Sequence, residues 1–211
     1  WADLPLRDLV AKRCALPVYI ANDSHVAALG EYIFGQTRKT PNLVVVKVGR
    51  GVGAGIVLNG RLYHGDGSGA GEIGHVRVVE DGVHCRCGHD GCLETVTSSQ
   101  AIVKQARLLA RRNPHSLLWQ FAPTLEAITT DVVLQAFQAG DPAIQQIIAE
   151  VGHYLGIALA NLVGVLNIQK IVIAGSVARF GAPLQAAIEQ EMRTRAMALL
   201  AEKTKMELTK I

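Results

Sequence analysis

The order of apolar and polar positions predicts strands in the first half of the chain and mainly helices after residue 96. Apolar or β-branched runs at 16–20, 43–49 and 75–79 are typical of strands. Residues 51–65 contain a glycine-rich turn, a strand, an Asn-Gly turn and a second strand, which is a strong hairpin signal. We expect these segments to form the sheet of the protein.

One helix is expected early in the chain, over residues 24–35, directly after the first predicted strand. Asp23 or Ser24 would cap its N-terminus, because short polar side chains accept hydrogen bonds from the first free backbone amides. Its apolar positions approximate one helical face, made of Val26, Leu29, Ile33 and Phe34.

The second half of the chain is dominated by helical periodicity. We expect helices at 98–112, 130–139, 141–166 and 181–203. The third opens at Asp141-Pro142, a cap followed by a proline in the first turn. A strand is expected at 170–175, and a last one begins at Lys205. This order of elements predicts an α/β fold of layers with an antiparallel corner.

Composition limits the classes of protein that the chain can belong to. It has 211 residues, of which 49% are hydrophobic and 18% charged, so it can bury a sizeable core. The net charge of +3 is too small to indicate nucleic-acid binding. The longest apolar candidate for a membrane span, 157–168, is short and contains two Asn, so we expect no membrane partner.

Four cysteines are too few for a disulfide scaffold, and we expect a cytoplasmic protein. Cys14 has no evident partner and is expected to be a buried core thiol. The chain begins at Trp1 rather than Met, which indicates a piece of a longer protein.

The remaining three cysteines cluster with histidines between residues 75 and 92. Three thiolates and one imidazole make a complete tetrahedral set for zinc, and the glycines around them allow a short loop to converge on one ion. The proposed ligands are His75, Cys85, Cys87 and Cys92. Four protein ligands would leave the zinc no open coordination position, so we expect it to be structural rather than catalytic. The alternatives are three unrelated buried cysteines or a redox pair, which the lack of a C-x-x-C motif disfavours. His84 and His89 are expected to be exposed loop histidines.

GEIGH at 71–75 followed by CRCGHDGCLE at 85–94 resembles the signature of the ROK family, whose name joins repressors, open reading frames and sugar kinases. The resemblance extends to the segments 21–31, 49–65 and 155–175. It implies an actin/hexokinase-like (ribonuclease H-like) α/β lobe with a zinc-stapled loop. Residues 1–211 would form most of the second of two lobes, and the first lobe and a last helix would lie outside this sequence.

The resemblance also implies a sugar site between the lobes. Its residues here would be Asn22, Asp23, Glu72, His75 and Glu94. Their chemistry suits a sugar, because carboxylates accept from hydroxyl groups and an amide both donates and accepts. One imidazole nitrogen of His75 would bind zinc and leave the other for a sugar hydroxyl. Read individually, Asp23 is also a helix cap, Asn22 a turn residue, and the two glutamates ordinary surface carboxylates.

Two functions fit the resemblance. In an ATP-dependent sugar kinase, Asp23 would be the general base, magnesium would offset phosphate charge, and phosphate would lie beside Gly49, Gly51, Gly53 and Gly175. In a transcription regulator, the pocket would bind sugar without ATP. The stretch Gly49-Arg50-Gly51 departs from the G-T-G of the kinases and resembles the regulators of the N-acetylglucosamine-repressor and xylose-repressor type. Ala174-Gly175-Ser176 likewise departs from the kinases' G-G turn.

We therefore expect a sugar-binding effector domain, with the kinase as the alternative and a zinc-stapled scaffold without a ligand as a third possibility. DNA would be bound by a separate N-terminal helix-turn-helix domain and not by this piece, and the family resemblance suggests a homodimer or homotetramer. The sequence does not name the sugar. Residues 115–123 are expected to be a variable helical insertion.

Overall fold

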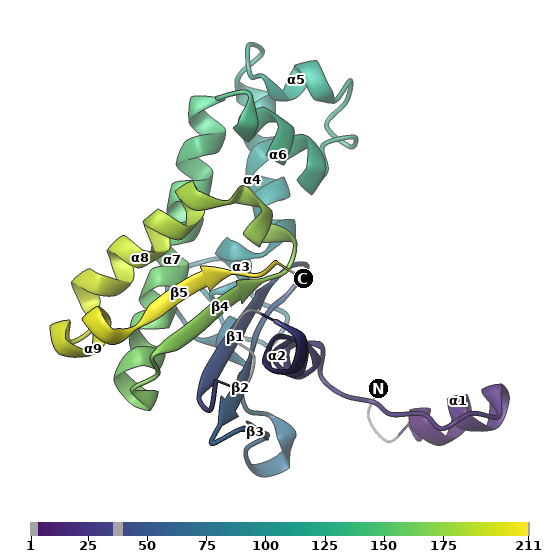
Figure 1. Ribbon diagram of the computed structural model, residues 1–211. Coiled ribbons are helices and arrows are strands. Elements are labelled where there is room, and N and C mark those ends of the chain that lie inside the picture. The colour runs from purple at the N-terminus through teal and green to yellow at the C-terminus, as the bar shows by residue number, and fades with distance from the viewer. Residues whose placement is uncertain (1–3, 36–39, 211) are drawn as a thin grey trace.

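The computed structural model describes residues 4–35 and 40–210, and a five-stranded mixed sheet lies at its centre (Figure 1). The strands are β1 (Leu43–Val48), β2 (Val52–Leu58), β3 (Arg61–Tyr63), β4 (Lys170–Ala174) and β5 (Lys205–Leu208), in the order β3-β2-β1-β4-β5. β1, β2 and β3 pair antiparallel, whereas β4 and β5 join the other edge of β1 as parallel strands. The predicted α/β fold with an antiparallel corner is confirmed.

Helices cover both faces of this sheet. The described helices are α1 (Leu6–Cys14), α2 (Asp23–Phe34), α3 (Glu94–Thr97), α4 (Ser99–Arg112), α5 (Leu118–Phe121), α6 (Thr130–Gln138), α7 (Pro142–Leu166), α8 (Ala182–Arg195) and α9 (Ala198–Lys203). Three 3-10 helices cover Asp66–Ser68, Ile73–His75 and Ser176–Phe180. The helices expected at 98–112, 130–139 and 141–166 are confirmed, as is the strand at 170–175.

Strand β1 is buried on both faces, which explains its continuous apolar sequence. Val44, Val46 and Val48 face the main core, which is built with α4, α6, α7 and α8. Leu43 and Val45 face a smaller core under α2. The sheet is thus a middle layer between a thick helical layer and the single helix α2 (Figure 1).

The helix predicted over 181–203 is broken into α8 and α9. Ala196 and Met197 have extended backbone between them. The break turns α9 back toward the core, where Ala201 is buried and the Thr204 hydroxyl donates to the carbonyl of Ile168. A single straight helix would carry these residues past the edge of the sheet.

The strand predicted at 16–20 was wrong, and so was the burial of Cys14. Leu16, Tyr19 and Ile20 are exposed, Tyr19 to 92%, and Cys14 is exposed on α1, a helix with no buried residue. Figure 1 shows α1 standing away from the sheet. A strand needs a hydrogen-bonded neighbour, and none lies beside 16–20 within the described residues.

The strand predicted at 75–79 was also wrong. His75 ends a 3-10 helix, and Arg77 makes only an isolated bridge to Cys92. The amides of Val78 and Val79 both donate to the carbonyl of Gly91, so this segment pairs with its own downstream loop instead of the sheet.

The helix at 24–35 is confirmed as α2, but its cap was predicted wrongly. Asn22 is the cap, because its Oδ1 accepts from the amides of Ser24 and His25. The apolar face is exposed, and the residues turned inward are Ser24, His25, Ala28 and Glu31.

The cause of this inverted burial is the glycine face of β2. A Cβ at Gly55 would lie 2.3 Å from the carbonyl oxygen of Ser24, and one at Gly53 would lie 2.5 Å from the Ser24 hydroxyl. The helix therefore approaches the strand so closely that only its small residues fit at the contact.

The segment 115–123 contains the short helix α5 and is held to the start of α7. Asp141 caps α7 through Oδ1, and its buried Oδ2 accepts from the Ser116 hydroxyl and the Leu117 amide at 2.9 Å each. The indole of Trp119 donates to the carbonyl of Asn113. The cap of the longest helix thus also fixes the insertion.

Helix α7 is long and apolar enough to cross a membrane, judged by length and composition alone. However, 56% of its most apolar window is buried inside the protein, and the core helix of a folded domain meets the same criteria. We therefore read α7 as the central core helix.

The packing of α7 against α8 yields a test of two glycines in one helix. A Cβ at Gly152 would lie 2.5 Å from the Cβ of Ala187, whereas nothing lies within 4 Å of one at Gly164. We expect Gly152→Ala to lower the free energy of unfolding by about 1–3 kcal/mol through overpacking. Gly164→Ala should leave it unchanged or raise it by up to about 1 kcal/mol. Urea unfolding of both variants measures this, and equal effects would contradict the packing described.

Candidate functional site

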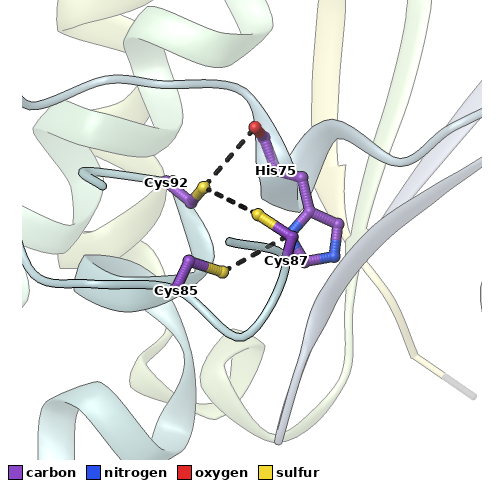
Figure 2. Close-up of side chains that lie close together, drawn as sticks. All are labelled: His75, Cys85, Cys87 and Cys92. Atoms are coloured by element: carbon purple, nitrogen blue, oxygen red, sulfur yellow. Dashed lines mark hydrogen bonds between the residues drawn. The ribbon is translucent and has the colours of Figure 1, made fainter. Parts of the chain in front are cut away.

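Three cysteines and one histidine converge beside the sheet, although up to seventeen positions separate them in the chain. Figure 2 shows the side chains of His75, Cys85, Cys87 and Cys92 pointing toward one another. Their ligand atoms all lie within 4.8 Å of one another. The Sγ atoms of Cys87 and Cys92 are 3.5 Å apart, as are the Sγ of Cys85 and the Nδ1 of His75.

These separations suit one tetrahedral ion. Zinc–sulfur bonds of about 2.3 Å imply sulfur–sulfur distances of about 3.8 Å around the metal. Three sulfurs and one imidazole nitrogen are also a donor set that zinc favours. The cluster can therefore hold a metal ion such as zinc, and the predicted ligands are brought together.

The loop that carries the cysteines is held by its own backbone. The Cys85 amide donates to the carbonyl of His89, and the Gly88 amide donates back to the carbonyl of Cys85. Gly91 has a φ of +72°, and a Cβ there would lie 1.8 Å from the carbonyl oxygen of Val79, so the turn requires glycine.

The two spare histidines are exposed, as expected. His84 Nδ1 lies 2.8 Å from a carboxylate oxygen of Asp90, and His89 Nδ1 lies 3.7 Å from the Sγ of Cys87. Neither belongs to the four-residue cluster.

Without a cation, the thiols of Cys87 and Cys92 differ widely in pKa. Burial and the neighbouring thiols raise the pKa of Cys92 to about 12, whereas hydrogen bonds from His89 lower the pKa of Cys87 to about 6. A divalent ion would offset the repulsion between thiolates, and its binding would release protons. The electrostatics of the cluster thus fit a metal centre.

A polar cavity of about 360 Å³ opens next to this cluster, and His75 belongs to both. All five residues predicted to bind sugar line the cavity: Asn22, Asp23, Glu72, His75 and Glu94. They come from the start of α2, from the 3-10 helix at Ile73–His75 and its preceding residue, and from the start of α3. The structure thus gathers every residue of the predicted set in one cavity.

The N-terminus of α2 supplies two of these side chains. Asn22 uses its carbonyl oxygen for the helix cap and turns its amide nitrogen toward Glu72, 3.5 Å from Oε1. Asp23 accepts from the ammonium of Lys47, which holds the pKa of its carboxyl below the usual range. Its side chain is 73% exposed, so it remains open to a ligand.

Glu94 joins the cysteine loop to the sheet. Its Oε2 accepts from the amide of Val52 at 2.9 Å, and its Oε1 lies 3.2 Å from the Nε of Arg86. His75 turns Nδ1 to the cysteines, whereas its Nε2 lies 3.8 Å from an oxygen of Glu72. The two nitrogens of one imidazole therefore face the cluster and the cavity, respectively.

Sequence reasoning missed two basic residues of the cavity, Lys47 and Arg86. Lys47 interrupts the apolar run of β1, and a charge inside a buried strand is the signal that could have found it. Arg86 lies between the predicted ligands Cys85 and Cys87 in the sequence. This position could have indicated that its side chain lies near the cavity beside the cluster. Arg50, noted above only as a departure from the G-T-G of the kinases, also lines this cavity.

The four glycines that we expected beside a phosphate all lie close to other residues of this protein. A Cβ at Gly51 would lie 2.8 Å from Oε2 of Glu94, and one at Gly175 would lie 2.5 Å from the carbonyl oxygen of Val48. Gly53 lies against Ser24, as described above, and Gly49 lies near the Ser176 hydroxyl. The first three glycines are therefore explained by packing alone.

Comparison with known proteins identifies the family. A sequence profile of the ROK family matches residues 1–210, almost the full length of the sequence. The chain belongs to the ROK family. Its curated relatives include both enzymes and regulators, and the chain spans about half to two thirds of their length.

Three relatives illustrate this range. A glucokinase of Halalkalibacterium halodurans is 38% identical over 96% of this chain and 62% of its own length. A xylose repressor of Caldicellulosiruptor bescii is 31% identical over 100% of this chain and 53% of its own. The DNA-binding transcriptional dual regulator NagC of Escherichia coli is 33% identical over 91% and 46%, respectively.

Solved structures give the same mixed picture and confirm the fold. A ROK transcriptional regulator described as a homologue of the E. coli Mlc protein aligns with a TM-score of 0.85, 34% identity and 98% of this chain covered, against 51% of its own. A ROK glucokinase from Streptomyces griseus, in complex with glucose and AMPPNP, aligns with a TM-score of 0.89, 30% identity and coverage of 99% and 68%. A regulator and a kinase thus both contain the fold of this chain.

The cysteine cluster yields a prediction about metal content. We expect one zinc ion per chain to co-purify, and Cys87→Ser to release it and loosen residues 75–95. The free energy of unfolding should fall by about 3 kcal/mol or more, because the binding energy of a structural metal is folding energy. Metal analysis and thermal unfolding measure both effects.

Cys14→Ser is the matched control, because this exposed thiol on α1 touches no part of the cluster. It should keep its zinc and its melting temperature. Complete loss of zinc from Cys87→Ser with unchanged melting would contradict a structural role for the metal.

Proposed function

We propose that this chain is the sugar-binding effector domain of a ROK transcription regulator, with a structural zinc beside the sugar pocket. The observation that carries the proposal is the convergence of Asn22, Asp23, Glu72, His75 and Glu94 in one cavity that shares His75 with the metal cluster. Carboxylates and an amide that converge on a small cavity suit a ligand with several hydroxyl groups.

The zinc would act on the sugar through the loop that it closes. If the metal held Nδ1 of His75, the imidazole ring would be fixed with Nε2 facing the cavity. The second nitrogen of a metal-bound histidine commonly contacts a polar group outside the metal site, as Nε2 would here. The same loop places Arg86 against Glu94. Zinc would therefore hold three cavity side chains in place without touching the ligand.

Two observations favour the regulator over the kinase. Lys47 lowers the pKa of Asp23, which weakens this carboxylate as a general base, whereas a low pKa does not hinder it as an acceptor for a hydroxyl. Ser176 also places its side chain beside Gly49, where a nucleotide needs close approach to the backbone. The kinase stays the second candidate, because Asp23 is open to the cavity and a glucokinase is 38% identical.

The rest of the regulator would lie outside this sequence. DNA would be bound by a separate helix-turn-helix domain, and a further lobe would form the opposite wall of the sugar site. Sugar in the cavity would change the geometry between lobes or subunits of a dimer or tetramer, and with it the spacing of the DNA-binding domains. This architecture, with a cytoplasmic location, remains part of the proposal.

The test measures sugar binding and operator binding on the longest native chain that carries this sequence. Calorimetry against a panel of hexoses, amino sugars and pentoses should find a ligand, and that ligand should change operator affinity at least fivefold. The same protein should not transfer phosphate from ATP to it. Sugar binding that leaves operator affinity unchanged would contradict the regulator, and sugar phosphorylation would establish the kinase.

Asp23→Asn provides the matching variant. We expect it to weaken sugar binding at least tenfold, because a neutral amide replaces a charged acceptor of hydroxyl protons. Asp66→Asn is the control, since Asp66 is an exposed carboxylate that does not line the cavity. Equal effects of the two variants would show that Asp23 does not bind the ligand.

A further inference from the structure

Helix α2 contacts the segment before Glu72 through one buried histidine. His25 lies three positions after Asn22 and is only 3% exposed. Its Nε2 lies 3.0 Å from the carbonyl oxygen of Ala70. A carbonyl oxygen can only accept, so Nε2 carries the hydrogen and donates it. A buried imidazole is thus bonded to a backbone group 45 positions away in the chain.

The acceptor of this bond ends a glycine-rich loop at 64–70, which follows β3 and precedes the 3-10 helix with His75. The residues of the loop are exposed or half-buried. Inside it, the amide of Ala70 donates to the carbonyl of His64. The bond from His25 is the one hydrogen bond between this loop and the rest of the described chain. The position of the loop relative to α2 therefore depends on a single side chain.

The next peptide is held by a different element. The amide of Ala54 on β2 donates to the carbonyl of Gly71 at 2.7 Å. Gly71 has a φ of +91°, and a Cβ there would lie 1.9 Å from the carbonyl oxygen of Ala54, so the chain touches the strand at this point. Two successive carbonyls, of Ala70 and Gly71, thus tie the segment to α2 and to β2. Glu72 follows them directly.

We infer that His25 is a positioning residue of the cavity: its bond to the loop sets Glu72 and His75 relative to the start of α2. The inference rests on the proposed function, because Glu72 and His75 belong to the proposed sugar site. Without the donor of His25, the segment would stay tied to β2 but lose its bond to α2. The hydrogen bond from Asn22 to Glu72 would remain, and at 3.5 Å it is long and therefore weak.

The alternative is a histidine that only fills space under α2. The ring of His25 packs edge to face with that of His64, with centroids 5.3 Å apart, so it also contributes packing. Packing depends on the size of the side chain, whereas positioning depends on the donor at Nε2. A glutamine carries its amide nitrogen as many bonds from the backbone as Nε2, and a leucine fills space without any donor. These two substitutions separate the roles.

The first test follows local hydrogen exchange by mass spectrometry in the longest native chain that carries this sequence. His25→Leu should speed exchange of the amides at 70–76 about tenfold, because this segment loses its bond to α2. His25→Gln should stay within about twofold of the unmodified protein, because the donor is kept. Both variants should leave exchange in β1 and α7 unchanged. This readout needs no ligand and is therefore independent of the proposed function.

Ligand affinity is the second readout. For the sugar that binds the unmodified protein best, His25→Leu should weaken binding about five- to tenfold and His25→Gln about twofold or less. Ser116→Ala is the matched control, because Ser116 is buried and donates to Asp141 but does not line the cavity. It should lower the melting temperature and change neither exchange at 70–76 nor sugar affinity.

Nitrogen-15 NMR of the unmodified protein keeps the inference testable if His25→Leu does not fold. At neutral pH the imidazole of His25 should carry its hydrogen on Nε2, in slow exchange with water. A hydrogen on Nδ1 alone would mean that the bond to Ala70 does not form, and the inference would fall.

Other results would overturn the inference as well. Unchanged exchange and affinity in His25→Leu would show that the bond positions nothing. Equal losses in His25→Leu and His25→Gln would assign His25 to packing, and equal effects of Ser116→Ala would reveal a general loss of stability. An unmodified protein that binds no sugar would contradict the proposed function, whereas faster exchange at 70–76 in His25→Leu but not in His25→Gln would still support the role of His25.

Discussion

The hydrogen bond from the Val52 amide to Glu94 is the link on which the site depends. Glu94 follows the last cysteine of the cluster by two positions and begins α3, whereas Val52 begins β2. This one carboxylate therefore ties the cysteine loop to the central sheet, and its other oxygen holds Arg86 of the same loop. The loop contains little regular structure, so its position depends on this contact, on the ligand cluster and on the backbone hydrogen bonds from Val78 and Val79 to Gly91. The cysteine cluster and the polar cavity are in this way parts of a single arrangement.

A second constraint places the remaining wall of the cavity. The glycine face of β2 lets α2 lie directly against the sheet, with Ser24 and Ala28 at the contact. This approach sets the helix N-terminus, and hence Asn22 and Asp23, beside Lys47 of β1. Larger residues on β2 would lift the helix and separate these groups. The glycines near the cavity thus serve the geometry of the protein itself, whatever they contribute to a ligand.

Much of this arrangement could be predicted from the sequence, and the failures have physical causes. The ligand cluster follows from short-range spacing, because four donors and their glycines lie within eighteen residues. The hairpin and the helices from α4 to α7 follow from local periodicity and capping. The sequence did not indicate which face of α2 is buried, because glycines on a strand about thirty residues away determine which face can approach the sheet. The strands expected at 16–20 and 75–79 failed because an apolar run forms a strand only beside a partner edge. The Lys47–Asp23 and Arg86–Glu94 pairs depend on tertiary contact, which periodicity does not report.

The most direct test of this account compares ligand affinity in the zinc-loaded and zinc-stripped protein. The sugar that binds best would be titrated into both forms by calorimetry, with circular dichroism to verify that the sheet and helices persist. If the metal holds His75, Arg86 and Glu94 in place, stripping it should weaken binding by about 10- to 100-fold, in the range typical of residues that orient a site. Unchanged affinity in a folded, zinc-free protein would contradict the account, because the cysteine loop would then be irrelevant to the cavity beside it.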